Sequence, residues 1–200
     1  MANTPMKLFL FFTAFTFFSC FSVRNDSVVR PRVDRSEAKT AFALLNDIRQ
    51  RPEAFQHELG LTSLNGISRT PLRWNSTLAK VAEARALDMA QREYFDHTDP
   101  DGFGPNYHIN QAGYTLNPDW LKHKETNNFE SIGANHPTAV DGIKALIAGK
   151  NSPGFRHRAH LLGMDEWNAS LNDVGIGFVR APSGSPYQSY ICVIIAKHDW

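Results

Sequence analysis

The chain has 200 residues, of which 42% are hydrophobic and 20% are charged. This is the composition of a folded protein, and the length suits a single domain. There are 21 lysines and arginines against 20 aspartates and glutamates. The chain therefore has no basic field that could hold nucleic acid or an anionic membrane by charge alone.

The first 19 residues are predicted to be an export signal. Lys7 precedes the apolar run LFLFFTAFTFF, which is shorter than the roughly 20 residues of a transmembrane helix and has the length of a signal-peptide core. Ser19 stands directly before Cys20, as a small residue does in the lipobox at which a bacterial lipoprotein signal is cut and its cysteine acylated. We therefore expect lipidation at Cys20. A plain secretory signal with an incidental cysteine is the alternative.

The segment after the signal is predicted to be a tether. Residues 20–35 mix polar side chains with scattered valines and a proline and show no sustained period, which is typical of a linker. Residues 36–200 are then the folded domain. Cys192 is the only other cysteine, so lipidation of Cys20 would leave the domain without an intramolecular disulfide.

Five segments of the domain are predicted to be helices: 36–50, 75–95, 105–112, 138–149 and 154–162. In the first, apolar residues recur at helical spacing after Ser36, the expected N-cap. The segment 75–95 has the clearest pattern, with Asn75 or Ser76 as its cap, and it ends before the turn signal Asp99-Pro-Asp-Gly.

Three segments are predicted to be strands. The pattern becomes extended over 127–135, apolar residues alternate over 173–180, and 188–197 is apolar almost throughout. The sequence APSGSP between the last two reads as a hairpin loop. Helices in this order with an antiparallel sheet predict an α+β fold, in which helices cover the apolar surface of the sheet.

Common catalytic motifs are absent from the sequence: H-E-x-x-H, G-x-S-x-G, the Walker loop, G-x-G-x-x-G and C-x-x-C. Cys192 lies in the middle of a predicted strand, where a thiol is usually inert packing. The remaining candidates for chemistry lie near the ends of elements: His97, Glu130, His157 and His160.

Four stretches of the chain, in order, carry the motifs of a known family. They are PLRWNSTLAKVAEARALDMAQREYFDHTDPDG, FESIGAN, ALIAGKNSPGFRHRAHLL and DVGIGF. They resemble the opening helix with its F-x-H-x-x-x-D-G close, the GENIA strand, the G-H-R-x-x-L-L segment and the V-G-V-G strand of the CAP superfamily (cysteine-rich secretory proteins, antigen 5 and plant pathogenesis-related proteins). The form that they resemble is the bacterial SCP-like extracellular one, over roughly residues 38–197.

The resemblance implies a three-layer α-β-α sandwich with a central antiparallel sheet, and a cleft that holds two histidines and two acids. His97 matches the first histidine, Glu130 the first glutamate and His157 the second histidine. The second acid is not recovered, because its expected region offers only Asp141. Arg156 also replaces the glycine that usually precedes the second histidine.

Two imidazoles and a carboxylate that converge would suit a zinc ion with an open position for water. A glutamate beside two histidines could instead stabilise an imidazolium near neutral pH. Each residue also has a purely structural interpretation. His97 could cap the preceding helix, Glu130 could pair with an arginine, and His157 with His160 could form a solvated polar face.

Aromatic residues are dense after the first motif and either pack or border an apolar groove for a lipid or peptide: Tyr94, Phe95, Phe103, Tyr107, Tyr114 and Trp120. Three functions follow. We favour a lipid-anchored binding module of the bacterial cell envelope, with a cleft for a small apolar, peptide or cell-wall ligand. The alternatives are a zinc-dependent hydrolase that uses His97, His157 and Glu130, and a structural surface protein with a vestigial cleft. Nucleic acid is not an expected partner.

Overall fold

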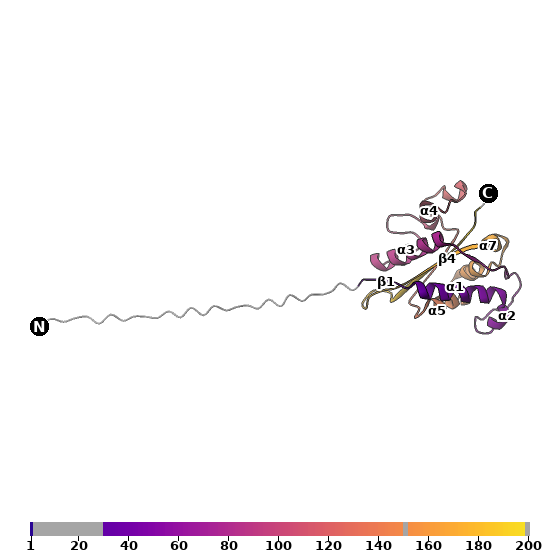
Figure 1. Cartoon of the computed structure of the whole chain (residues 1–200), viewed down its shortest axis with the longest axis horizontal. Coiled ribbons are helices and arrows are strands. Elements are labelled where there is room, and N and C mark those ends of the chain that lie inside the picture. Colours follow the sequence, from indigo (N-terminus) through magenta and orange to yellow (C-terminus); the bar gives the residue numbers. More distant parts are fainter. Residues whose placement is uncertain (2–29, 150–151, 199–200) are drawn as a thin grey trace.

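The computed structural model describes Met1, residues 30–149 and residues 152–198 (Figure 1). Residues 2–29 lie outside the described residues. They include the predicted export signal beyond Met1, Cys20 and the first part of the predicted tether. The end of that tether is different from the prediction, because Arg32–Val33 forms a strand and the first helix begins at Arg35. The folded domain therefore starts four residues before the predicted boundary.

A five-stranded sheet forms the centre of the domain. Its main path runs in the order β1 (Arg32–Val33), β4 (Asp173–Arg180), β5 (Ser189–Ala196) and β3 (Glu130–Ala134), and β2 (Arg73–Trp74) also pairs with β4. All pairs are antiparallel except that of β2 with β4. The three predicted strands are confirmed, and β3 lies at the end of the sheet.

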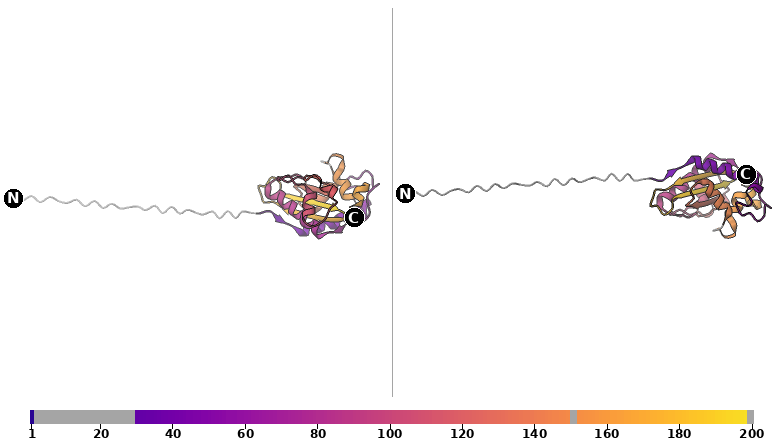
Figure 2. Two further views of the ribbon diagram at one scale, coloured as in Figure 1. Left: turned by 90° about the horizontal axis from the view of Figure 1, so that it is seen from above. Right: turned by 90° about the horizontal axis from the view of Figure 1, so that it is seen from below.

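Helices cover both faces of this sheet. They are α1 (Arg35–Gln50), α2 (Pro52–Phe55), α3 (Ser76–Arg92), α4 (Pro105–Gln111), α5 (Ala139–Ala148), α6 (Arg156–Leu162) and α7 (Glu166–Ser170), with 3-10 turns at Pro118–Leu121 and Pro153–Phe155. In Figure 1, α3 lies on one side of the strands and α1 with α5 on the other. The two views of Figure 2 show these helices from above and below, with the strands between them. The predicted α-β-α sandwich is confirmed.

Helix α3 lies unusually close to β4, because β4 has glycine where the helix crosses it. A Cβ atom at Gly177 would lie 2.4 Å from the backbone of Ala82, and one at Gly175 would lie 2.1 Å from the backbone of Leu78 and Ala79. The alternate residues of β4 are the apolar ones that the sequence pattern identified. This tight contact fixes the position of α3, and with it the position of every side chain that α3 directs toward β3.

Two helix boundaries are set by residues other than those predicted. Asp34, and not Ser36, is the N-cap of α1, and its carboxylate accepts a hydrogen bond from a backbone N–H of the first turn. Helix α3 is capped by Asn75 as predicted. It ends at Arg92 because Glu93 has a left-handed backbone conformation, with φ of 56°. Within the part of the chain that the structure describes, no helix is long and apolar enough to cross a bilayer.

Candidate functional site

A cleft of about 720 Å³ lies at the start of β3, between the loop that follows α3 and the helices α6 and α7. All three predicted site residues, His97, Glu130 and His157, line it. Most of the remaining lining is polar: Asn127, Asn128, Ser131, Ser152, Arg156, His160, Asp165 and Asn168. The fold therefore brings together the residues that the sequence singled out.

Glu130 is held by partners on both of its carboxylate oxygens. Nε of Arg85 lies 3.1 Å from Oε2, and Nδ1 of His97 lies 2.9 Å from Oε1. The side chains of Arg85 and Glu130 are 2% and 0% exposed. Burial alone would raise the pKa of Glu130, but the hydrogen bond from His97 and the charge of Arg85 together lower it below its usual value. Glu130 is therefore a carboxylate.

The charge of Glu130 fixes the proton on His97. A carboxylate only accepts hydrogen bonds, so Nδ1 of His97 is the donor. Nε2 is then the nitrogen that remains for a ligand. His97 thus donates to Glu130 and not to the end of α3, where the carbonyl of Met89 accepts from the backbone of Glu93 and Tyr94.

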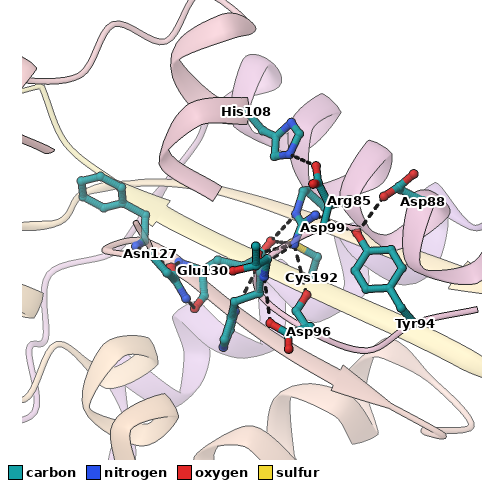
Figure 3. A network of polar contacts seen from close by, with 12 residues as sticks. Arg85, Asp88, Tyr94, Asp96, Asp99, His108, Asn127, Glu130 and Cys192 are labelled. Carbon is teal, nitrogen blue, oxygen red and sulfur yellow. Dashed lines mark hydrogen bonds and ion pairs between the residues drawn. The ribbon is translucent and has the colours of Figure 1, made fainter. Parts of the chain in front are cut away.

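Arg85 also holds the loop that carries His97. Its guanidinium donates to the carbonyl of Asp96 at 3.2 Å and to that of His97 at 2.8 Å. It donates as well to the hydroxyl of Tyr94 (Figure 3). One buried cation on α3 therefore positions both the acid of β3 and the histidine loop.

Cys192 belongs to the same network, next to Glu130 in Figure 3. Its Sγ donates to Oε2 of Glu130 at 3.2 Å. Burial and the neighbouring carboxylate raise the pKa of the thiol well above its usual value. The thiol therefore stays protonated, in agreement with the prediction that Cys192 is no nucleophile.

On the other side of β3, one hydroxyl holds two histidines. Oγ of Ser131 lies 2.9 Å from Nδ1 of His157 and 2.8 Å from Nδ1 of His160. A hydroxyl has a single proton, so Ser131 donates to one imidazole and accepts from the other. No motif in the sequence pointed to Ser131, and His160 is a buried partner of this hydroxyl and not part of a solvated face.

Both of these histidines are neutral at physiological pH. Burial lowers the pKa of His160 to about 4, and the carbonyl of Ile195 offsets only part of that shift. Burial also lowers the pKa of His157, and the nearby imidazole of His97 lowers it further. His157 therefore offers the cleft a neutral ring with its Nδ1 already engaged.

The two cleft histidines meet across the edge of the sheet. Successive side chains of a strand point to opposite faces, so Glu130 holds His97 on the α3 face while Ser131 holds His157 on the α6 face. The centroids of the two imidazole rings are 6.3 Å apart. Neighbouring residues of one strand thus orient one histidine each toward a shared cleft.

The second acid of the cleft is not Asp141. That residue pairs with Thr138 at the N-terminus of α5, away from the cleft lining. The acid that does line the cleft is Asp165. It caps α7, and both of its oxygens accept hydrogen bonds from Asn168.

The residues present do not fit a zinc site with three protein ligands. Within residues 30–149 and 152–198, no group of three or more His, Cys, Asp and Glu side chains could hold a metal ion. Both oxygens of Glu130 are occupied, which leaves one nitrogen each on His97 and His157. Zinc sites in proteins normally use three or four protein ligands.

Comparisons with known proteins agree on the fold. The model of the family described as "CAP: Cysteine-rich secretory protein family" matches residues 42–195. The uncharacterized protein YkwD of Bacillus subtilis (strain 168) is 29% identical over 113 residues, which cover 56% of this chain and 37% of that protein.

Two solved structures are similar as well. One is an extracellular protein containing a SCP domain from Bacillus anthracis str. Ames, with a TM-score of 0.52, 22% identity, and coverage of 82% of this chain and 41% of that one. The other is an outer surface protein from Borrelia burgdorferi, with a TM-score of 0.53, 15% identity, and coverage of 83% of this chain and 98% of that one. The chain thus spans well under half of the two Bacillus proteins.

Proposed function

The chain belongs to CAP, the cysteine-rich secretory protein family, and from this premise we propose that it is an exported binding module of the bacterial cell envelope. Its cleft captures a polar ligand, a peptide or a cell-wall fragment, between His97 and His157. The observation that carries this proposal is the pair of imidazoles, 6.3 Å apart and each held from behind by a buried partner. A site whose polar groups are oriented in advance loses little entropy when a ligand binds.

Binding is better supported than hydrolysis. The acid that a hydrolase would use as a general base, Glu130, is fully buried and engaged with Arg85, and its lowered pKa makes it a weak base. Ser131 is only 1% exposed, so its hydroxyl does not reach a substrate as a nucleophile would. These groups instead orient the two histidines.

The lining of the cleft favours a polar ligand over the apolar one also considered from the sequence. Asn168 and Asp165 contribute amide and carboxylate groups, and Trp167 contributes an aromatic face. Peptides and cell-wall fragments present amides and hydroxyls, which such groups recognise by hydrogen bonds, while an indole provides a flat surface for stacking.

The proposal is tested by cosedimentation of the whole chain with purified bacterial cell-wall sacculi. We expect the wild type to sediment with the sacculi and the variants His97→Ala and His157→Ala to bind at least tenfold more weakly. His57→Ala is the matched control, because His57 is exposed and does not line the cleft. Equal binding by all four proteins, or no binding by the wild type, would refute the proposal.

Export and membrane anchoring belong to the same proposal. The similar structures are described as extracellular and outer-surface proteins, and the sequence before residue 20 has the pattern of a lipoprotein signal. Acylation at Cys20 would hold the domain at a membrane, with residues 21–31 as the tether. After expression in bacteria, the wild type should partition into the detergent phase and Cys20→Ser into the aqueous phase. Aqueous wild-type protein would refute the anchor.

A further inference from the structure

We propose that the free edge of β3 binds an extended peptide as an additional strand, which leads into the cleft between His97 and His157. This inference deepens the proposed function by naming its ligand class, and it rests on that function only for the role of the cleft. The observations that carry it are the backbone of β3 and the pocket along its edge.

The register of the sheet shows which backbone groups of β3 face outward. The N–H of Ile195 donates to the carbonyl of Phe129, and the N–H of Asn135 donates to that of Ser189. In an antiparallel pair, hydrogen-bonded residues alternate, so residues 129, 131, 133 and 135 point their backbone groups toward β5. Glu130, Ile132 and Ala134 therefore point theirs away from the sheet.

Only one of these three outward residues has its backbone groups satisfied. Asn127 accepts from the N–H of Glu130 and donates to its carbonyl. Among the described residues, no hydrogen bond is made by the outward N–H or C=O of Ile132 or Ala134. Both residues line a pocket along this edge. The unpaired backbone groups of an edge strand are a template for pairing with a further strand, so Ile132 and Ala134 can accept one.

A second pocket, of about 540 Å³, lies along this stretch. Ile132, Gly133 and Ala134 line it, Phe95 borders it, and Ala145 and Ala148 of α5 contribute further apolar surface. Phe95 is 39% exposed, one of the few large apolar side chains exposed in the described part of the chain. His157 lines this pocket as well as the cleft, so the two hollows are neighbours along β3.

A peptide fits these features better than a glycan does. The unpaired groups of Ile132 and Ala134 alternate between donor and acceptor at the spacing of a strand, and an extended peptide presents the complementary series. The apolar wall would contact alternate side chains of that peptide. At Glu130 the side chain of Asn127 already occupies the edge, so the added strand ends there, at the mouth of the cleft.

The test uses the blocked peptide Ac-Ala-Thr-Val-Thr-Ala-NH2 and the same peptide N-methylated at every amide. Added to the isotope-labelled whole chain, the first peptide should shift the backbone amide signals of Ile132 and Ala134 and slow their hydrogen exchange. The N-methylated peptide lacks the backbone N–H donors that an added strand needs, so we expect its affinity to be at least about tenfold lower. Equal binding of both peptides, or no response of these two amides to the first peptide, would overturn the proposal.

Two variants at one position test it from the side of the protein. Ala134→Pro removes an N–H that makes no hydrogen bond in the free protein, and proline is tolerated at such an edge position. We expect its unfolding midpoint to stay close to that of Ala134→Ser, which keeps the N–H. Only the proline variant should bind the peptide with an affinity at least tenfold lower. Equal peptide binding by the two variants would contradict the added strand. If Ala134→Pro does not fold, the N-methylated peptide still decides.

The two proposals fail in different ways. Suppose that sacculi bind through His97, but that neither N-methylation nor Ala134→Pro changes the peptide affinity. The cleft then has a ligand, and the proposal of an added strand is refuted. If the peptide pairs with β3 but sacculi do not bind, the strand site stands and the cell-wall role falls.

Discussion

Oε1 of Glu130 lies 2.9 Å from Nδ1 of His97, and the same buried carboxylate is paired with Arg85. The sequence left two interpretations of Glu130 open: that it belongs to the cleft, or that it pairs with an arginine. In the structure it does both. The acid connects the interior of the domain to its cleft. Its role is to hold an imidazole in place, and several consequences can be measured.

Loss of the acid should destabilise the fold. In Glu130→Gln the guanidinium of Arg85 stays buried without its counter-charge, so we expect the free energy of unfolding to fall by about 3 kcal/mol or more. The matched control is Glu83→Gln on α3, because Glu83 pairs with Arg35, whose side chain is 80% exposed. That change should cost far less, because an exposed ion pair contributes little to stability. Urea denaturation measures both, and equal losses would contradict the assigned role of the buried pair.

Stability should decline as the pH falls from 6.5 toward 4. The pKa of His160 is about 4 in the folded protein, against the ordinary value of 6.5. Between these values the unfolded chain takes up a proton that the folded chain does not, so this group lowers the free energy of unfolding by up to about 1.4 kcal/mol per pH unit. Glu130, whose pKa is lowered from 4.5, adds a further loss only below that pH.

The variant His160→Gln isolates this effect. It should reduce the slope of the unfolding free energy between pH 6 and 4.5, whatever it does to the stability at pH 7, since the titrating group is gone. His57→Ala, at an exposed position, should leave the slope unchanged. An unchanged slope in His160→Gln would show that this histidine is not held neutral by burial.

The close contact between α3 and β4 also makes a prediction. Gly177→Ala places a Cβ atom 2.4 Å from the backbone of Ala82, so helix and strand must separate. We expect a loss of at least about 3 kcal/mol, at the upper end for overpacked cores. Gly60→Ala should lower the free energy of unfolding by only about 1 kcal/mol. The new Cβ atom has open space around it, so the only cost is the strain of a positive φ. Thermal unfolding of both variants tests the difference.

Much of the fold could be predicted because it follows from local patterns. Apolar residues recur at helical spacing in α3, alternate in β4 and fill β5. These patterns predicted the layers of the fold correctly. Arg85 stood in the apolar stripe of α3, and a charge at such a position indicates a buried partner. The two-residue strands β1 and β2 could not be predicted, because so short a segment has no period and is held by its neighbour β4.

The candidate site was predictable only in part. His97, Glu130 and His157 were found through family motifs, and the structure brings them together. Ser131 was missed because its importance depends on which two imidazoles fold onto it. Asp165 was missed for a similar reason, since its sequence context indicates only a helix cap. Contacts between distant segments have no local signature.

We expect the whole chain to bind zinc only weakly. At the cleft, His97 and His157 each leave one imidazole nitrogen for a metal, the Nε2 of His160 is buried, and the described ranges contain no cluster of three suitable ligands. Calorimetric titration with zinc chloride should therefore show no stoichiometric site of submicromolar affinity. Such a site, abolished by both His97→Ala and His157→Ala, would contradict this ligand count and revive the hydrolase alternative.

The most direct test of the shared cleft is an NMR pH titration of the His157 imidazole in the wild type, in His97→Ala and in the control His57→Ala. Burial and the neighbouring His97 hold the pKa of His157 below 6.5. We predict that His97→Ala raises this pKa toward 6.5, while His57→Ala leaves it unchanged. If removing His97 leaves the titration of His157 where it was, the two rings do not influence each other, which would contradict the shared cleft.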